Sequence, residues 1–320
     1  MSLLDVRDLV VEIEARPRAS RPVDQVSFTI EAGEILGMVG ESGAGKSLTG
    51  SAILGLLPPQ ARIAGGAILL QGERIDALPP SRLRRVRGRR VGLIVQDALT
   101  ALDPLHTIGA QLAETMRTHL PLTAVEARRE AVAWLARVGI AAADRRVDAY
   151  PHELSGGQRQ RVVIALALCA GPELVIADEP TSGLDVSVQA RIVVLLKRLA
   201  RERGMAVLLI THDMGVVADA ADRVAVMYAG RIIEIGPVAR VVRQPAHPYT
   251  EGLMASIPSI HERQARLRQI DGSMPRPDAI PTGCPFAPRC PKSLPRCRQD
   301  RPELITLDVG AAACWLHGSG

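Results

Sequence analysis

The chain is poor in aromatic residues, since two Trp, three Tyr and two Phe make up only 2% of its 320 residues while 47% are hydrophobic. Its core must therefore be built from Ala, Val, Leu and Ile. No apolar run approaches the roughly 18 residues of a membrane span, and the N-terminal stretch MSLLDVRDLVVEIEARPR lacks the apolar block of a signal peptide. We therefore expect a cytosolic chain.

Lysine is nearly absent: the only lysines are Lys46, Lys197 and Lys292, so arginine carries almost all of the positive charge. The formal net charge of +5 is modest and is explained by arginine-rich codon usage. Charge alone gives no reason to expect a nucleic-acid partner. The length exceeds that of a usual single domain, which predicts one large domain with an appendage, or two domains.

A phosphate-binding pattern stands near the N-terminus. Residues 26–40 predict a hairpin followed by a short apolar strand that runs into GESGAGKS at 40–47. In this glycine-rich pattern, backbone amides turn toward phosphates, Lys46 adds a charge at the β and γ phosphates, and the Ser47 hydroxyl can ligate Mg²⁺. A helix predicted to follow directs its positive end at the same phosphates. The predicted ATP-binding residues are Gly40, Ser42, Gly43, Ala44, Gly45, Lys46, Ser47 and Leu48; the alternative is a glycine-rich turn without a ligand.

Two apolar strands further along the chain end in polar residues. ELVIADEP at 173–180 predicts a buried parallel strand that delivers Asp178 and Glu179 to its carboxyl end. There Asp178 would hold magnesium through its water shell, and Glu179 would polarise the attacking water. AVLLITHD at 206–213 brings His212 to the same edge. Such residues are often only solvated strand ends, but a phosphate loop in the same chain favours the catalytic interpretation.

The stretch LSGGQRQR at 154–161 carries a family resemblance. With GESGAGKS, LVIADEP, SGLD at 182–185 and THD at 211–213, the chain resembles the ATPase subunit of an ABC transporter over about 240 residues. The resemblance implies an α/β fold: a P-loop NTPase (RecA-like) core with an antiparallel β portion and a helical subdomain. It places the nucleotide-binding domain at 1–240, its helical subdomain at about 100–160, and a C-terminal extension at 241–320.

The LSGGQ stretch would be a second phosphate-binding site. Its serine and glycines precede a helix predicted to begin at Gln158, whose amides and dipole attract an anion. The resemblance implies that this stretch closes over ATP held by the phosphate loop of a second ATPase subunit, so that each site is shared. The residues expected to act in trans are Ser155, Gly156, Gly157, Gln158 and Asp185.

VGLIVQDALTALDP at 91–104 resembles the glutamine loop of the same family. Gln96 would sense magnesium and the attacking water, and Ser47 and Asp178 would bind the same magnesium ion. The mostly helical segment at 105–153 would contact the membrane permease. Just before it, SRLRRVRGRR at 81–90 contains six arginines. We expect these to form a solvated face, with contact to anionic lipid or the permease as the less favoured alternative.

One departure from the family concerns adenine. Many relatives stack an aromatic ring on the base about twenty residues before the phosphate loop, but residues 7–27 contain no aromatic residue. Ile13, Arg16 or Arg18 could cover the base, or affinity could rest on the triphosphate; the sequence does not choose between them.

The stretch QPAHPYTEGLMASIP resembles the extension of peptide-importer ATPases, a group that includes oligopeptide, dipeptide, nickel and glutathione importers, and His247, Pro248 and Tyr249 match its signature. The resemblance implies a peripheral subunit on the cytoplasmic face of the inner membrane. Its partners would be two permease subunits, an extracytoplasmic solute-binding protein, and a second ATPase copy or paralogue, with no nucleic acid. A nickel, glutathione or other small-solute importer, a soluble ABC ATPase and an exporter are the alternatives.

Four cysteines lie in the extension, with five, six and sixteen residues between Cys284, Cys290, Cys297 and Cys314. In a reducing cytosol, clustered cysteines indicate metal ligands more than disulfides. The spacing alone selects neither zinc nor an iron–sulfur cluster. The likeness of GCPFAPRC to a segment of some peptide-importer ATPases implies a [4Fe-4S] cluster; zinc, with His317 as a spare ligand, and free thiols are the alternatives. Cys169 is expected in the core.

Overall fold

The computed structural model describes residues 2–14, 19–256 and 269–318. The chain divides into two compact units, which interleave along the sequence. The first unit contains residues up to Leu3, Ile30–Ile35 and Ala77–Leu209, and the second unit contains Leu4–Thr29, Leu36–Asp76 and Ile210–Gly320. Each unit is described by itself.

The first unit is built on three neighbouring strands, in the order β8-β7-β6. They are β6 (Val91–Ile94), β7 (Leu174–Asp178) and β8 (Ala206–Ile210). β6 and β7 run parallel, with Val91 opposite Leu174 and Ile94 opposite Ala177. Because nearly every residue of these strands is buried, they read as continuous apolar runs without alternation, as the sequence indicated.

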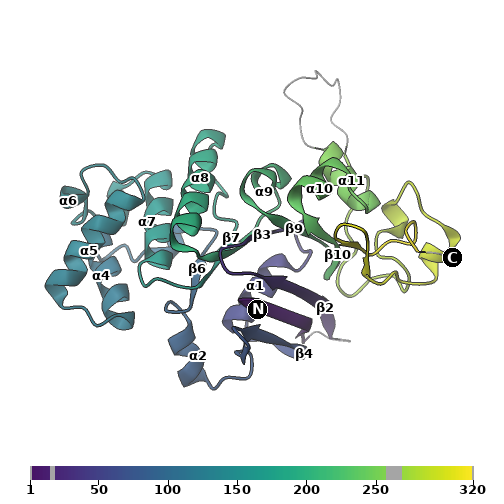
Figure 1. Cartoon of the computed structure of the whole chain (residues 1–320), viewed down its shortest axis with the longest axis horizontal. Helices are drawn as coiled ribbons and strands as arrows, with labels where there is room; N and C mark the ends of the chain where they lie inside the picture. Colours follow the sequence, from purple (N-terminus) through teal and green to yellow (C-terminus); the bar gives the residue numbers. More distant parts are fainter. Residues whose placement is uncertain (1, 15–18, 257–268, 319–320) are drawn as a thin grey trace. The chain divides into compact units, whose positions relative to one another are not determined.

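Helices make up most of the rest of the first unit. They are α2 (Pro80–Val86), α3 (Ala98–Ala101), α4 (Ile108–His119), α5 (Ala124–Arg137), α6 (Ala143–Arg146), α7 (Gly156–Leu168) and α8 (Val186–Arg203). Helices α4 to α7 gather around one another (Figure 1). α5 begins with a capping box in which Thr123 and Glu126 satisfy each other's backbone amides. The segment expected to be mostly helical, 105–153, contains α4, α5 and α6.

The second unit contains two groups of strands. The first is an antiparallel sheet in the order β2-β1-β4-β5, formed by β1 (Leu4–Ile13), β2 (Ser20–Ile30), β4 (Ala61–Leu70) and β5 (Glu73–Arg74). The second runs in the order β11-β12-β10-β9-β3, from β3 (Ile35–Val39), β9 (Arg223–Tyr228), β10 (Arg231–Pro237), β11 (Ile305–Thr306) and β12 (Ala311–Ala312). Over 26–40, the predicted apolar strand is confirmed as β3, whereas the hairpin predicted before it is wrong, because residues 26–30 belong to β2, which neighbours β1 in the other sheet.

The second unit also holds the helices α1 (Lys46–Leu54), α9 (Met214–Ala220), α10 (Val238–Arg243) and α11 (Pro248–Ala255). Its C-terminal part has little regular structure: two 3₁₀ turns, Ala287–Arg289 and Pro295–Arg298, and the short strands β11 and β12. Strand β12 pairs with β10, which ties this part to the sheet (Figure 1).

Three of the chain's few aromatic side chains form one cluster in the second unit. The rings of Tyr228, Tyr249 and Phe286 lie 4.7 to 5.4 Å apart, centroid to centroid, with their edges toward one another's faces. Such edge-to-face pairs contribute about 0.5–1.5 kcal/mol each beyond their buried area. The scarce aromatics are therefore concentrated where the C-terminal extension packs on strand β9.

The arginine run at 81–90 has two different roles. Arg84 and Arg85 are exposed on α2, as a solvated face requires. Arg89, in contrast, donates to the carbonyls of Ala170 and Gly171, and Arg90 pairs with Glu173 at 3.2 Å. The prediction of a solvated face therefore fits only the helical part, because the last two arginines brace the edge of β6.

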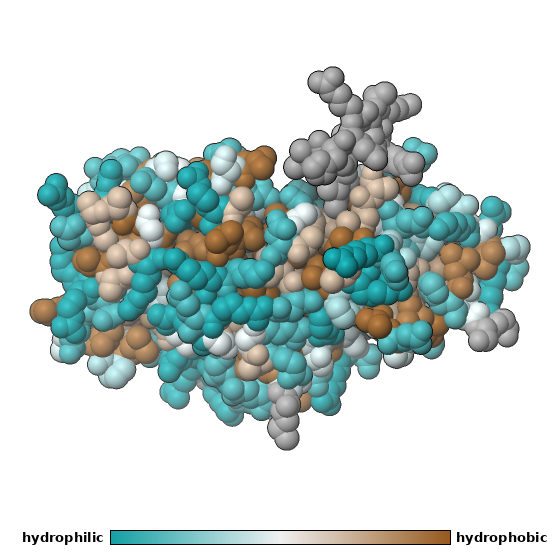
Figure 2. Space-filling model, turned by 45° about the horizontal axis from the view of Figure 1, so that its top comes forward, coloured by the Kyte–Doolittle hydropathy of each residue, from teal (hydrophilic) through white to brown (hydrophobic). Residues whose placement is uncertain are grey.

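Membrane-spanning segments are not found among the described residues: none of their helices is both long and apolar enough to cross a bilayer. The face drawn in Figure 2 mixes hydrophobic and hydrophilic residues over its whole width. Single exposed apolar side chains, such as Leu99, Leu105 and Val186, occur among the described residues.

Candidate functional site

The phosphate loop of the second unit joins β3 to α1. Gly40 has a φ of 153°, and a Cβ atom there would lie 2.3 Å from the carbonyl oxygen of Met227. No larger residue fits, since real Cβ atoms do not come so close to a backbone oxygen. Gly43 and Gly45 also have positive φ, and Gly45 is the N-cap of α1. The glycines therefore let the chain turn tightly and leave α1 directed with its N-terminal end at the loop, the end that attracts anions.

Lys46 is folded back over the loop that it follows. Its side chain is buried, and its Nζ donates to the carbonyl oxygens of Gly40 at 2.8 Å and Glu41 at 3.0 Å. Thr49 closes the first turn of α1 by donating from its hydroxyl to Gly45 O. The lysine ammonium is thus held against the backbone of the loop, at Gly40 and Glu41.

His212 lies at the start of α9, between two fixed backbone segments. On one side, the amide of Thr211 donates to Met38 O in β3. On the other, Asp213 caps α9 by accepting from the amides of Gly215 and Val216. The His212 residue is exposed. Its backbone is therefore well defined at the carboxyl end of β8, while its ring can reach outward.

In the first unit, the predicted carboxylates follow β7. Asp178 is the last residue of that strand and Glu179 comes directly after it; both are half-buried. Glu179 has a φ of 48°, a left-handed conformation that a residue with a side chain adopts only under constraint. The amide of Ser182 donates to Glu179 O, which closes the turn.

Gln96 meets this turn from the neighbouring strand. Because β6 and β7 are parallel, their carboxyl ends lie at one edge, and the Gln96 Nε2 donates to the Ser182 hydroxyl at 3.3 Å. The structure thus brings Gln96 together with the loop that follows Asp178 and Glu179. Ser182 was not singled out by its own sequence signal, although it belongs to the SGLD stretch.

The LSGGQ stretch forms the start of α7. The Ser155 hydroxyl accepts from the amide of Gln158, and the Gln158 side chain accepts from the amide of Ser155, a reciprocal capping box. This cap places Gly156 in the first helical position, so the helix begins there and the prediction that it begins at Gln158 is wrong. A Cβ on Gly157 would lie 2.8 Å from Val188 Cγ1, so this glycine also permits close packing of α7 against α8.

Asp185 has a structural role that the sequence did not reveal. It is the N-cap of the 18-residue helix α8, and its Oδ1 accepts from the amide of Val188 at 2.9 Å. Loss of such a cap typically costs about 1 kcal/mol of helix stability. Substitution of Asp185 would therefore act on α8 as well as on any contact across an interface.

The His-Pro-Tyr segment is bound to a buried carboxylate. Glu234 of β10 is only 3% exposed and accepts from the amides of Ala246 at 2.7 Å and His247 at 2.9 Å. His247 caps α11, since its Nδ1 accepts from the amide of Tyr249, and Pro248 occupies the first helical position. The tripeptide is thus a helix start that places the Tyr249 ring in the aromatic cluster.

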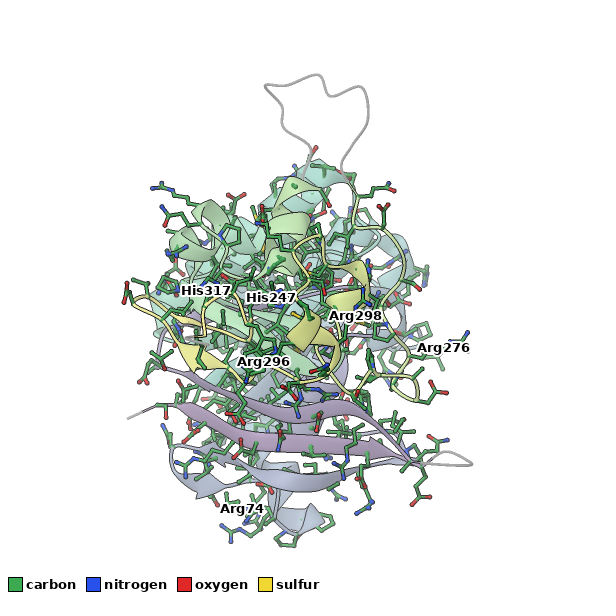
Figure 3. All side chains as sticks on the ribbon, turned by 90° about the vertical axis from the view of Figure 1, so that its right-hand side faces the viewer. Arg74, His247, Arg276, Arg296, Arg298 and His317 are labelled. Atoms are coloured by element: carbon green, nitrogen blue, oxygen red, sulfur yellow. The ribbon has the colours of Figure 1, made fainter. Side chains whose placement is uncertain are left out.

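The buried His247 makes a pH dependence predictable. Burial, with the nearby His317 as a smaller cause, lowers the pKa of His247 to about 3 (the two are labelled in Figure 3). An unfolded histidine takes up a proton near pH 6.5, whereas the folded protein excludes it, so this residue's contribution to stability is present above that pH and is lost as the pH falls toward 3. We expect a loss of about 1.4 kcal/mol per pH unit below about pH 6.

Denaturant unfolding of the full chain between pH 7.5 and 5, followed by circular dichroism, measures this loss. His247→Asn keeps a helix-capping oxygen but does not titrate, so its stability should fall less steeply with pH than that of the wild type. Equal slopes for the two proteins would contradict the assignment.

The four cysteines of the extension line one small pocket, together with His247, Phe286 and Trp315. All four thiols are free of disulfides. Burial raises the pKa of Cys284 to about 11, and it also raises the pKa values of Cys290 and Cys314. Without a metal, the thiols of Cys284, Cys290 and Cys314 are therefore protonated at neutral pH. Within the described ranges, no group of three or more His, Cys, Asp or Glu side chains is arranged to hold a metal ion.

Cys169 and His317 are not among the residues that line this pocket. Cys169 is buried at the end of α7, where burial raises its pKa to about 12, so the prediction of a core cysteine is confirmed. The Nε2 of His317 lies 2.6 Å from the carbonyl oxygen of Ala246, so that nitrogen is engaged with the backbone.

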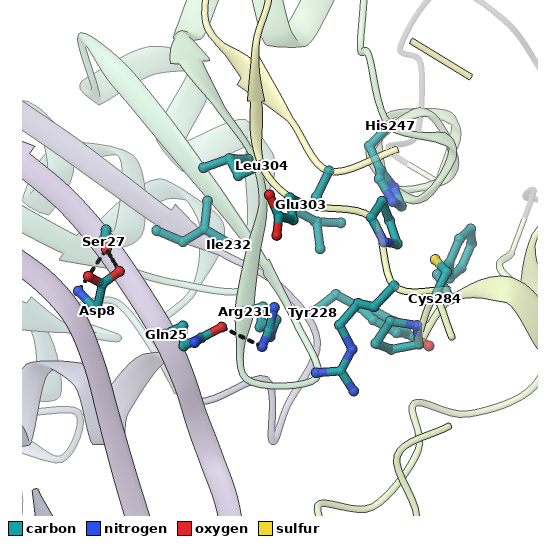
Figure 4. A pocket seen from close by; sticks show the side chains of 16 residues that line it. Asp8, Gln25, Ser27, Tyr228, Arg231, Ile232, His247, Cys284, Glu303 and Leu304 are labelled. Carbon is teal, nitrogen blue, oxygen red and sulfur yellow. Dashed lines mark hydrogen bonds between the residues drawn. The ribbon is translucent and has the colours of Figure 1, made fainter. Parts of the chain in front are cut away.

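A cavity lies elsewhere in the second unit. It measures about 450 Å³ and is lined by residues of β2, β10 and the extension, including Gln25, Arg231, Cys284 and Glu303 (Figure 4). Arg231 is occupied there by bonds to Gln25 and Asp24. No residue of 40–48 lines this cavity, so it is not the phosphate site.

The question of adenine stays open. Ile13 ends strand β1 and is half-buried, and Arg16 and Arg18 lie outside the described residues. The described part of the chain therefore gives no observation that selects among them.

Two family profiles match the chain. The family described as ABC transporter matches residues 23–182, and the family described as oligopeptide/dipeptide transporter, C-terminal region, matches residues 233–297. Together they cover the phosphate loop, the LSGGQ stretch, the β7 carboxylates and three of the four clustered cysteines.

Several proteins are similar over nearly the whole chain. A probable peptide ABC transporter ATP-binding protein of Sinorhizobium fredii is 46% identical over 98% of this chain and 94% of its own length. The dipeptide transport ATP-binding protein DppD of Bacillus subtilis is 44% identical over 98% of this chain and 95% of its own. Among solved structures, a dimeric ATP-binding cassette in a post-hydrolysis state with ADP and Pi matches with a TM-score of 0.66 and 26% identity, over 73% of this chain and 98% of that chain.

Proposed function

Because the chain belongs to the ABC transporter ATP-binding proteins, we propose that it is the ATP-hydrolysing subunit of an importer that takes up peptides across the cytoplasmic membrane. The observation that carries this proposal is the match of two family profiles in one chain, a cassette followed by the extension of oligopeptide and dipeptide transporters. Relatives that are 44% and 46% identical over almost their whole length bear names of peptide-transport ATPases.

ATP is proposed to bind at the phosphate loop. Backbone amides of residues 40–48 and the Lys46 ammonium would surround the phosphates, which is supported by the bonds that hold the Lys46 Nζ against Gly40 O and Glu41 O of the loop. Ser47, Gln96 and Asp178 would organise Mg²⁺, an ion that prefers oxygen ligands. Glu179 would act as general base toward the attacking water, and His212 would stabilise the γ phosphate.

A second ATPase subunit is proposed to complete each site. Ser155, Gly156, Gly157 and Gln158 form the capped N-terminus of α7, a helix of 13 residues whose dipole suits a phosphate supplied by the partner. Asp185 would cross the same interface. Because both subunits would contact the γ phosphate, ATP binding would favour closure and hydrolysis would release it.

The remaining partners follow from the importer assignment. We expect two permease subunits, an extracytoplasmic solute-binding protein, and a position on the cytoplasmic side of the membrane. Residues 1–240 would form the nucleotide-binding domain, with the helical subdomain at about 100–160 facing the permease, and 241–320 the extension.

Gentle solubilisation of membranes that contain the tagged protein, followed by mass spectrometry, tests these partners. Recovery with two multi-span permeases, a second ATPase and a binding protein is expected, and ATP-dependent uptake of labelled peptides by that complex in proteoliposomes would establish the solute class. Recovery from the soluble fraction with ribosomal or DNA-associated proteins would overturn the transport assignment but not the ATPase chemistry.

A metal centre in the extension is a finer part of the proposal. Cys284, Cys290, Cys297 and Cys314 are soft donors that line one pocket, which fits the thiolate ligands of a [4Fe-4S] cluster, with zinc as the alternative. Binding would have to draw these thiols together and displace their protons. The centre would hold the loops of the extension in one arrangement.

Anaerobic purification of the full chain tests this part. About four iron and four sulfide per chain are expected, and Cys290→Ala should lose them. Cys169→Ala is the matched control, because Cys169 is a buried cysteine of α7 that is not among the residues lining the pocket, and it should keep the metal. A content of about one zinc per chain would show that the site binds zinc and not a [4Fe-4S] cluster. A wild-type protein without metal would refute both the cluster and the zinc site.

A further inference from the structure

The C-terminal extension contacts the phosphate loop most directly at Glu41. Arg289 Nη1 donates to both carboxylate oxygens of Glu41, at 2.9 and 3.1 Å. The amide of Glu41 donates to the Tyr249 hydroxyl at 3.0 Å. The carbonyl oxygen of the same residue accepts from Lys46 Nζ. The amide, carbonyl and carboxylate of Glu41 are thus all engaged, and two of these partners, Tyr249 and Arg289, come from the extension.

The Arg289 guanidinium is buried and fixed by several hydrogen bonds. Its side chain is 7% exposed, in a pair whose carboxylate is 29% exposed. Its Nε donates to Asp271 O and its Nη2 to Ile270 O, while Nη1 also reaches the Tyr228 hydroxyl at 3.3 Å. The guanidinium lies 5.9 Å from the centre of the Tyr228 ring. A planar group fixed on all its nitrogens can define the position of a carboxylate, which a flexible lysine cannot do as well.

A second contact reaches the middle of the loop. Met274 Sδ accepts from the amide of Ala229, and its Cε lies 3.4 Å from where a Cβ on Gly43 would be. The extension therefore borders the loop at two places that are separate in sequence, 274 and 289.

We propose that the extension positions the phosphate loop for ATP, with Arg289 and Tyr249 as positioning residues that act through Glu41. The physical link is short: Lys46 Nζ is bonded to Gly40 O and Glu41 O, so a displacement of Glu41 displaces the acceptors that hold the lysine ammonium. The inference rests on the proposed role of residues 40–48 in binding ATP. The inference goes beyond that proposed role because it assigns to the extension an effect on the affinity for ATP.

The same contact connects the cysteine pocket with the loop. Arg289 ends the 3₁₀ turn Ala287–Arg289, which lies between Cys284 and Cys290, and both cysteines line that pocket. The segment that carries Arg289 is therefore bounded on both sides by residues that line the pocket.

Steady-state ATPase kinetics of the assembled transporter test the proposal. Arg289→Met should raise the KM for ATP about tenfold, the loss expected for a charge-assisted hydrogen-bonded pair, while kcat stays within about twofold. Glu41→Gln should raise the KM for ATP about as much as Arg289→Met does, without disturbing the packing of the extension. The double variant should be no worse than either single one, because the two side chains act as a unit. Arg296→Met, which removes an exposed pair with Asp300 in the same extension, is the matched control and should leave KM unchanged.

The outcomes separate this inference from the ATP site itself. If Lys46→Met loses ATP affinity while Arg289→Met and Glu41→Gln keep the wild-type KM, the extension merely packs on the loop and the inference fails. Additive effects of the two substitutions would also overturn it. If Lys46→Met keeps wild-type affinity, the assignment of the phosphate loop fails instead.

Discussion

Glu179→Gln is expected to lower the kcat for ATP hydrolysis by the assembled transporter at least about 100-fold, the range that a positioned general base contributes. Glutamine has nearly the same shape but does not accept a proton from water. The left-handed φ of 48° at Glu179 and the turn closed by Ser182 hold this side chain at the carboxyl end of β7. The measurement is steady-state phosphate release at saturating ATP.

Equilibrium ATP binding separates chemistry from binding in the same variant. Its affinity should stay within about twofold of the wild type, since the lost function belongs to the transition state. Glu173→Gln is the matched control: it lies just before β7 and pairs with Arg90 at the half-exposed edge, so its turnover should be normal. Full turnover by Glu179→Gln would show that another group activates the water.

Lys46→Met is expected to weaken ATP binding about 100-fold, the second large effect. The substitution removes the positive charge that a phosphate would contact, and such charge-assisted bonds are strong in a partly buried site. It also removes the bonds from Nζ to Gly40 O and Glu41 O, which help to close the loop. Equilibrium titration of the full chain with ATP and Mg²⁺ measures the loss.

Lys292→Met is the control for this substitution. Lys292 pairs with Glu251 at the exposed surface, so its loss removes a lysine of the second unit without touching the loop. Circular dichroism should show that both variants keep the helix content of the wild type. Wild-type affinity of a folded Lys46→Met protein would place the phosphates elsewhere.

Local sequence determined much of the candidate site. The phosphate loop needs glycines at backbone positions that other residues cannot adopt, and the strand before it is a fully buried apolar run, so both are readable from neighbouring residues. The proximity of Gln96 to the turn after Asp178 could also be predicted, because parallel strands bring their carboxyl ends to one edge of the sheet.

Other features were decided by contacts that local sequence does not encode. The start of α7 at Gly156 depends on a reciprocal cap between Ser155 and Gln158, and the hairpin expected at 26–40 gave way to two strands in different sheets. Two of the six arginines in the run at 81–90, Arg89 and Arg90, hold the edge of β6 through bonds to Ala170 and Glu173. In each case a partner elsewhere in the fold outweighed the local pattern.

The family and its ATP-binding motifs were determined by the sequence alone, because those motifs are short stretches whose chemistry depends on adjacent residues. Only the tertiary structure decided what the extension does near them. Nothing in the His-Pro-Tyr segment or in GCPFAPRC indicates that Tyr249 and Arg289 would meet Glu41, some 208 and 248 residues earlier in the chain. Contacts at such separations arise when strands and loops pack, and a single sequence does not specify which pairs will meet.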